Sequence, residues 1–214
     1  MDRILERMGE LGVVPVVVLE RKEDAVPLAG AMKAGGIPCA EITLRTSAGL
    51  AAIEALAEQE DEDFLVGAGS VLTRENCRDA VAAGAKFIVS PGFNRRVVEY
   101  CIEREITVLP GCVTPTEITE ALEMGLDTVK FFPAGTYGGL SAMKALAGPF
   151  PGIHFVPTGG VSEKNLAEYL KAPFVRAVGG SWLCTRGDIA AGRFAHITSL
   201  CRQAGEIKRK AEQV

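Results

Sequence analysis

Thr128-Val129-Lys130-Phe131-Phe132 is a run of β-branched and aromatic residues with a single cation, and it is the sixth of eight similar runs along the chain. Runs of this composition favour β-strands. Because they are apolar almost throughout, without alternation of apolar and polar positions, they are typical of parallel strands that are covered on both faces. The other seven runs are 15–19, 39–43, 64–66, 86–89, 106–109, 153–156 and 175–178.

Alanine-rich amphipathic segments lie between these predicted strands and predict helices, for example at 48–57, 75–83 and 117–124. The strand and helix unit recurs at intervals of roughly 20 to 26 residues, which favours an α/β fold. Eight such units in 214 residues match a minimal (β/α)8 barrel, or TIM barrel. The alternative, an open doubly wound sheet, usually has a glycine-rich turn after its first strand, and Leu19-Glu20-Arg21-Lys22 is not one. We therefore predict one barrel domain over residues 1–214.

The start of the chain carries two further expectations. Residues 2–11 form an amphipathic segment ahead of the first strand, which predicts an extra N-terminal helix closing the N-terminal end of the barrel. Pro15 would harm a central strand because proline has no N–H to donate. We therefore place it at the first residue of its strand, where proline is tolerated.

Composition and charge argue against several classes of protein. The formal net charge is −4 with acidic and basic residues interspersed, so no basic face indicates nucleic acid. No apolar run reaches the ~20 residues of a membrane span, and the first residues lack the apolar centre of a signal peptide. The sequence predicts a cytoplasmic protein with neither a membrane nor a nucleic acid as partner.

Cysteine and histidine usage predicts no metal site. The six cysteines are scattered without a C-x-x-C pair, so in a cytoplasmic chain we expect them to be reduced and buried. Neither of the two histidines has a second histidine or a cysteine at metal-ligand spacing. His154 lies within an apolar run, and we expect it to be a core residue with its hydrogen bonds satisfied.

Lys130 is the first candidate for chemistry, because the catalytic groups of such barrels lie at the C-terminal ends of strands. Side chains alternate along a strand, so Lys130 and Phe132 share one side, and Glu41, Thr43 and Arg45 share one side of the second strand. A lone lysine beneath a helix would be costly, so we expect Lys130 to face the interior with Glu41 as its partner. Two interpretations stay open: an ion pair that serves only the core, or a nucleophile beside a proton-transferring carboxylate. Desolvation against Phe132 favours the neutral, nucleophilic amine, whereas Glu41 favours the charged one.

Glycine pairs follow the seventh and eighth predicted strands, where barrels of this kind commonly bind phosphate. The backbone N–H groups of Gly159-Gly160 and Gly179-Gly180 can approach an anion closely, and Ser181 can add a hydroxyl. The alternative is that these glycines only make tight turns. Arg45 also has two interpretations, a bidentate clamp for a substrate carboxylate and a surface ion pair.

Six motifs, in order from about Val13 to Leu183, make the chain resemble a known family. It resembles bacterial 2-keto-3-deoxy-6-phosphogluconate (KDPG) aldolase, also called 4-hydroxy-2-oxoglutarate (KHG) aldolase. The motifs are Glu41-Ile42-Thr43-Leu44-Arg45-Thr46, Gly67-Ala68-Gly69-Ser70-Val71-Leu72, Ser90-Pro91-Gly92, Lys130-Phe131-Phe132-Pro133-Ala134, Pro157-Thr158-Gly159-Gly160-Val161 and Gly179-Gly180-Ser181-Trp182-Leu183.

The resemblance implies a class I aldolase, a carbon–carbon lyase of carbohydrate metabolism that cleaves KDPG to pyruvate and glyceraldehyde 3-phosphate, with a side activity on 4-hydroxy-2-oxoglutarate. It implies that Lys130 forms a Schiff base and that Glu41 is the general acid and base. It also implies a homotrimer that needs neither a metal nor a cofactor. The other site residues that it implies are Arg45 and Ser70 for the pyruvate carboxylate, Thr158 for the substrate's hydroxyl groups, Pro91 and Phe132 for the pocket wall, and Gly159, Gly160, Gly180 and Ser181 for the phosphate.

The chain departs from the family at Ser70, where threonine is common, although the hydroxyl is retained. Residues 135–137 are also unfamiliar and leave the aldehyde preference open. Two rival functions share the barrel. A sugar-phosphate isomerase or epimerase would not need Lys130 as a nucleophile. The intact set of Glu41, Arg45 and Lys130 argues against a non-catalytic sensor of phosphate ligands, and the low histidine count argues against a metal-dependent aldolase.

Overall fold

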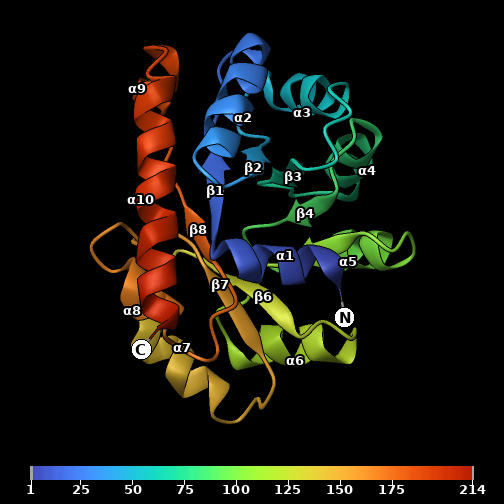
Figure 1. Ribbon diagram of the computed structural model, residues 1–214. Coiled ribbons are helices and arrows are strands. Elements are labelled where there is room, and N and C mark those ends of the chain that lie inside the picture. Colours follow the sequence, from blue (N-terminus) through green and yellow to red (C-terminus); the bar gives the residue numbers. More distant parts are fainter. Residues whose placement is uncertain (1, 214) are drawn as a thin grey trace.

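The computed structural model describes residues 2–213, in which eight parallel β-strands alternate with helices (Figure 1). The strands are β1 (Val13–Val17), β2 (Cys39–Thr43), β3 (Leu65–Gly69), β4 (Phe87–Val89), β5 (Thr107–Leu109), β6 (Thr128–Phe131), β7 (His154–Pro157) and β8 (Val178–Gly180). The helices are α1 (Arg3–Leu11), η1 (Lys22–Asp24), α2 (Ala25–Ala34), α3 (Gly49–Ala57), α4 (Arg74–Ala82), α5 (Arg95–Ile102), α6 (Pro115–Glu123), α7 (Gly139–Ala147), α8 (Leu166–Leu170), α9 (Arg186–Ala190) and α10 (Phe194–Glu212).

The strands belong to two hydrogen-bonded sheets. Six form a half-barrel in the order β5-β4-β3-β2-β1-β8, and β6 pairs with β7 in a second sheet. Isolated parallel bridges join the two sheets at both edges, between Gly111 and Lys130 on one side and between Thr158 and Gly179 on the other. The chain is therefore an α/β fold whose strands are parallel, and helices surround them in Figure 1.

Seven of the predicted strands overlap the observed ones over two or more residues, but the eighth is displaced and shares only Val178. The run 175–178 was predicted as a strand, whereas β8 covers Val178–Gly180. Val175 makes only an isolated bridge to Phe155, and the ladder with β1 begins at Val178. Ladder hydrogen bonds come from the backbone, so a glycine segment can form a strand when its neighbour offers the right edge.

The placement of Pro15 at the start of a strand is wrong, because it is the third residue of β1. The N–H of Val178 donates to the carbonyl of Gly12, so by alternation Val14 bonds to β8 and the nitrogen of Pro15 points toward β2. The register between β1 and β2 begins only at Val16, opposite Glu41. The missing N–H of Pro15 therefore falls just before that ladder begins.

The predicted N-terminal helix is confirmed, and it lies across one end of the strands (Figure 1). The Asp2 side chain caps α1 by accepting from the N–H groups of Ile4 and Leu5, and Gly12 ends the helix with a φ of 73°. Met8 is completely buried among inward-facing strand residues. This interior core consists of Met8, Val14, Cys39, Leu65, Phe87, Val89, Leu109, Val156 and Ala177. A larger apolar layer separates the strands from the surrounding helices.

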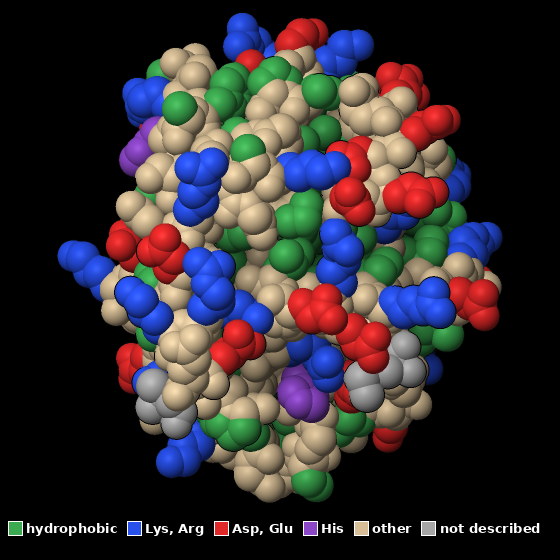
Figure 2. Space-filling model, viewed as in Figure 1, with side chains coloured by type: hydrophobic (Ala, Val, Ile, Leu, Met, Phe, Trp, Pro, Cys, Tyr) green, Lys and Arg blue, Asp and Glu red, His purple; other side chains and the backbone are tan. Residues whose placement is uncertain are grey.

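The distribution of surface charge and the state of the cysteines agree with what the sequence predicted. Lys, Arg, Asp and Glu side chains are interspersed over the face seen in Figure 2, without a field of one sign. All six cysteines are buried free thiols, as predicted. Among residues 2–213, no helix combines the length and the apolar character that crossing a bilayer requires.

Candidate active site

The predicted contact between Lys130 and Glu41 is present on the interior side of the two sheets. The Lys130 Nζ lies 3.0 Å from Oε1 and 3.3 Å from Oε2 of Glu41, although β6 and β2 are not neighbours. The two side chains are only 5% and 4% exposed. A buried pair of this kind contributes little to stability compared with apolar packing, so its presence suggests another use.

Glu41 fits only because its neighbours in β3 are glycines. A Cβ placed on Gly69 would lie 2.6 Å from Cγ and 2.7 Å from Cδ of Glu41, so any side chain there would displace the carboxylate. Gly67 pairs with Glu41 in register. Because Gly67 has no side chain, the ring of Phe87 fills the space beside it. The carboxylate therefore lies in a slot lined by glycine backbone, above an aromatic residue of the interior core.

Phe132 lies close to Lys130, and the backbone of Pro91 lies against Gly111, the residue that pairs with Lys130. The Nζ of Lys130 is 5.5 Å from the centroid of the Phe132 ring. Gly111 pairs with Lys130, and its lack of a Cβ admits the Pro91 backbone. The Phe132 ring in turn borders Gly159, where a Cβ would lie 3.5 Å from it.

Arg45 and Ser70 form a second polar group at the C-terminal ends of β2 and β3. The Nε of Arg45 donates to the Oγ of Ser70 at 2.8 Å. No salt bridge involves Arg45 in residues 2–213, so the surface ion pair is not formed and the guanidinium charge is free for a ligand. Ser70 has a φ of 56°, a strained conformation for a residue other than glycine. A β-branched threonine would be strained more, so serine suits this backbone and keeps the hydroxyl.

Thr158 presents an unsatisfied hydroxyl to the interior. It follows β7, is 5% exposed, and its Oγ1 has no hydrogen-bond partner among the described residues. Leaving a buried polar group unpaired costs about 1–3 kcal/mol. Gly179 makes room for this side chain, since a Cβ there would lie 2.9 Å from that of Thr158. The hydroxyl is therefore positioned for a ligand.

The glycines after β7 and β8 differ in what they do. Gly159 and Gly160 both have a φ of 85°, and neither of their N–H groups donates to another described residue. Two adjacent free donors are what an anion requires. Gly180 is needed for packing instead, because a Cβ at this position would lie 2.8 Å from Cγ1 of Val13. Ser181 follows it and is exposed at the same end of the strands.

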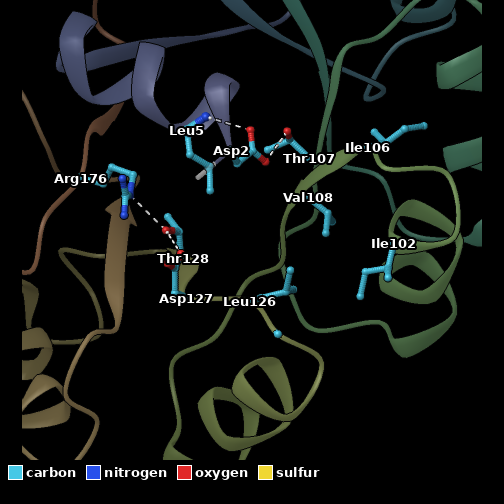
Figure 3. Close-up of a pocket in the computed structure, with 11 residues that line it drawn as sticks. Asp2, Leu5, Ile102, Ile106, Thr107, Val108, Leu126, Asp127, Thr128 and Arg176 are labelled. Carbon is cyan, nitrogen blue, oxygen red and sulfur yellow. Dashed lines mark hydrogen bonds between the residues drawn. The ribbon is translucent and has the colours of Figure 1, made fainter.

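A second polar cluster lies at the opposite, N-terminal end of the strands, around a cavity of about 220 Å³ beside α1 (Figure 3). Arg176 donates from Nε to the Thr128 hydroxyl at 3.1 Å, and its NH2 lies 3.3 Å from Nδ1 of His154. His154 is therefore satisfied as predicted, but it is the half-exposed first residue of β7 and not a core residue. Burial and the nearby Arg176 lower the pKa of His154, so the neutral imidazole accepts this bond.

The structure thus gathers the predicted residues Glu41, Arg45, Ser70, Pro91, Lys130, Phe132, Thr158, Gly159, Gly160, Gly180 and Ser181 at the C-terminal ends of the strands. Sequence reasoning missed the part played by Gly69, Gly111 and Gly179, which make room for Glu41, Pro91 and Thr158. Alternation offered a signal, because Gly69 lies two residues from Gly67 and both share the inward side of β3. No group of three or more potential metal-ligating side chains converges anywhere in residues 2–213.

Comparisons with known proteins point in one direction. A family model described as KDPG and KHG aldolase matches residues 4–200. The 2-dehydro-3-deoxy-phosphogluconate aldolase of Treponema pallidum is 51% identical over 207 residues, 97% of this chain and 98% of that protein. The KDPG aldolase of Legionella pneumophila, solved with pyruvate captured as a covalent carbinolamine intermediate, has a TM-score of 0.88 and 42% identity over 92% of this chain and 97% of its own. The Zymomonas mobilis enzyme, solved with 3-phosphoglycerate, has a TM-score of 0.88 and 37% identity over 99% of both chains.

Proposed function

This chain belongs to the KDPG and KHG aldolase family, and from that premise we propose that it cleaves KDPG to pyruvate and glyceraldehyde 3-phosphate through a Schiff base on Lys130. The observation that carries the proposal is the buried contact of Lys130 with Glu41 at 3.0 Å. A buried amine can attack a ketone as a nucleophile, and a carboxylate within hydrogen-bonding distance can transfer the protons that the reaction requires. The carbinolamine formed by the Legionella pneumophila enzyme is the intermediate expected from such an attack.

Glu41 carries the protons in this mechanism. It takes a proton from the Lys130 ammonium, and the free amine attacks the C2 ketone to form a carbinolamine. Glu41 then gives that proton to the carbinolamine hydroxyl, which leaves as water, so that a protonated imine and an ionised Glu41 result. Glu41 then accepts the C4 hydroxyl proton while the C3–C4 bond breaks. The aldehyde leaves, and the electron pair stays on the pyruvyl fragment as an enamine. Protonation at C3 and hydrolysis of the imine release pyruvate and restore Lys130.

The remaining residues bind different parts of the substrate. Arg45 and Ser70 hold the carboxylate of the pyruvyl half, with Arg45 supplying an unpaired guanidinium. The unsatisfied Thr158 hydroxyl bonds to the hydroxyls of the chain beyond C3. Pro91 and Phe132 form the walls. The phosphate is held by Gly159, Gly160, Gly180 and Ser181, in keeping with the free N–H groups of the first two.

We further infer that the two sheets close into a complete (β/α)8 barrel within a single domain covering residues 1–214. The isolated bridges at both edges of the six-stranded sheet and the continuous apolar layer beneath the helices support this inference. A homotrimer in the cytoplasm is the assembly and location that fit the family resemblance. Size-exclusion chromatography with light scattering tests the trimer.

We expect purified protein to cleave KDPG and, more slowly, 4-hydroxy-2-oxoglutarate. Both substrates share the pyruvyl half that Arg45 and Ser70 grip, but only KDPG offers a phosphate to the glycines after β7 and β8. Pyruvate release, followed by coupling to lactate dehydrogenase, measures both rates. Isomerised or epimerised sugar phosphate without pyruvate would support the isomerase alternative, and binding without turnover would support the sensor. A tenfold preference for 4-hydroxy-2-oxoglutarate would reassign the substrate but not the mechanism.

Gly160→Asp should raise the KM for KDPG by roughly 10- to 100-fold, because a carboxylate would face the phosphate and a Cβ would lie 2.9 Å from the Cα of Gly135. The KM for 4-hydroxy-2-oxoglutarate should change much less. Steady-state kinetics on both substrates make the comparison.

Two further variants separate phosphate binding from backbone strain. Ser181→Asp adds the same charge at an exposed position and should show the same selective loss. Gly36→Asp imposes the same aspartate on another glycine, with a φ of 84° in open space, and should leave both KM values unchanged. Equal losses on both substrates in Gly160→Asp and Ser181→Asp would contradict the phosphate assignment.

A further inference from the structure

Two of the buried cysteines lie side by side between neighbouring helices. Cys77 of α4 and Cys101 of α5 have their Sγ atoms 3.4 Å apart, within hydrogen-bonding distance for sulfur. Both side chains are completely buried. Among residues 2–213 no other pair of cysteines makes such a contact, although Cys39, Cys112, Cys184 and Cys201 are buried as well.

We propose that Cys77 and Cys101 are a dithiol site that hydrogen peroxide converts to a disulfide joining α4 to α5. A disulfide holds its sulfurs about 2.05 Å apart, so these two need to approach by only about 1.4 Å. The α4 and α5 helices already pack on each other, so side-chain rotation with a small adjustment of the helices supplies that movement. The site is separate from the Lys130 pocket.

The surroundings make Cys77 the nucleophile of the pair. The hydrogen bond with Cys101 lowers the pKa of the Cys77 thiol although burial opposes this, and the nearby Arg104 guanidinium favours the thiolate form of both cysteines. The same contact, together with burial, raises the pKa of Cys101. Burial raises the pKa of Cys39, Cys112 and Cys184, and that of Cys201 to about 12. The thiolate is the more nucleophilic form, so oxidation by peroxide should begin at Cys77.

The surface above this pair is hollowed. A cavity of about 260 Å³ is lined by residues of α4 and α5 that flank the two cysteines in sequence, together with Arg104 just beyond α5. The Arg104 guanidinium lies 3.9 Å from the centroid of the Tyr100 ring, beside the contact between α4 and α5. Solvent therefore comes close to the contact between α4 and α5, although both thiols are fully buried, so an oxidant reaches them only through a local opening of this contact. This favours hydrogen peroxide over a bulky disulfide as the oxidant. The lining residues are Arg74, Glu75, Arg78, Tyr100 and Arg104.

The reaction balances with peroxide as the only co-reactant. The Cys77 thiolate attacks one peroxide oxygen, the O–O bond breaks, and Cys77 becomes a sulfenic acid while hydroxide leaves. The sulfur of Cys101 then attacks Cys77, the S–O bond breaks, and its thiol proton ends on the departing oxygen. Overall, two thiols are oxidised to one disulfide and one hydrogen peroxide is reduced to two waters.

The cross-link should stabilise the fold, since it ties residues 24 apart in sequence whose helices follow β3 and β4. The same region is already held by the Asn94 side chain, which donates to the carbonyl of Leu72 at 2.9 Å. A loop of that size restricts the unfolded chain enough to raise the melting temperature by about 5–10 °C.

The test is peptide mapping of the folded full chain after peroxide treatment and alkylation of the remaining thiols in denaturant. Trypsin can cut at Arg78, Lys86, Arg95 and Arg96, so a disulfide appears as two linked peptides that separate on reduction. We expect this one linkage, four alkylated cysteines, and a melting temperature that rises on oxidation and returns with dithiothreitol.

Matched variants identify the site. Cys77→Ala and Cys101→Ala should each abolish the linkage and the shift in melting temperature, whereas Cys39→Ala, at another buried thiol, should keep both. Alkylation of all six cysteines after treatment would overturn the proposal. So would irreversible oxidation of Cys77 without a linkage, or a linkage that lowers the melting temperature.

Discussion

Lys130→Arg should abolish KDPG cleavage, lowering kcat/KM by roughly 10⁴-fold or more, because the guanidinium stays protonated and cannot form an imine. The variant keeps a positive charge opposite Glu41, so the buried ion pair and the fold should survive. Treatment with pyruvate and borohydride should add one reduced pyruvyl group per wild-type chain, mapped to Lys130 by mass spectrometry. The variant should acquire none.

A matched control is available on the surface of α2. Lys33 is exposed and paired with Asp61 at 2.7 Å, so Lys33→Arg changes the same atoms without touching the pocket. It should retain normal turnover and label at Lys130. A pyruvyl adduct on another lysine, or near-normal turnover by Lys130→Arg, would leave the ion-pair interpretation of Lys130 as the better one.

Glu41→Gln should lower kcat for KDPG by about 10²–10⁴-fold while still allowing pyruvate to be trapped on Lys130. The amide fills the slot beside Gly69 and can still accept a hydrogen bond from Lys130, but it cannot take the C4 hydroxyl proton. The loss should therefore appear in kcat and in the rate of trapping, not in the final yield of trapped pyruvate.

The melting temperature separates this prediction from a purely structural role. If Glu41 served only the core, Glu41→Gln would destabilise the protein and leave turnover of the folded fraction intact. Glu99→Gln, at an exposed carboxylate paired with Arg95, controls for loss of charge and should be silent in both assays. Normal kcat in Glu41→Gln would remove Glu41 from the chemistry.

The features that were predicted correctly are those that follow from the local sequence pattern. Alternation places Lys130 and Glu41 on interior faces, and parallel strands bring such faces together, so their contact follows from the two strands alone. The inward glycines were not foreseen as space for Glu41 and Thr158, because that need depends on side chains in neighbouring strands. Pro15 and β8 were misplaced for a related reason: the partner strand, and not the run itself, decides where a ladder begins.

The N-terminal helix has a consequence for the order of events in the proposed reaction. Together with the interior core, α1 fills the space between the sheets on the side of Lys130 away from the substrate residues, with Met8 and Phe87 fully buried. In the proposed reaction the substrate therefore approaches Lys130 from the C-terminal ends of the strands, and both products leave by the same side. The pyruvyl group stays bound covalently to Lys130 after the C3–C4 bond breaks, whereas the aldehyde is held only by noncovalent contacts. We therefore expect cleavage to release the aldehyde before pyruvate, and synthesis to take up pyruvate before the aldehyde.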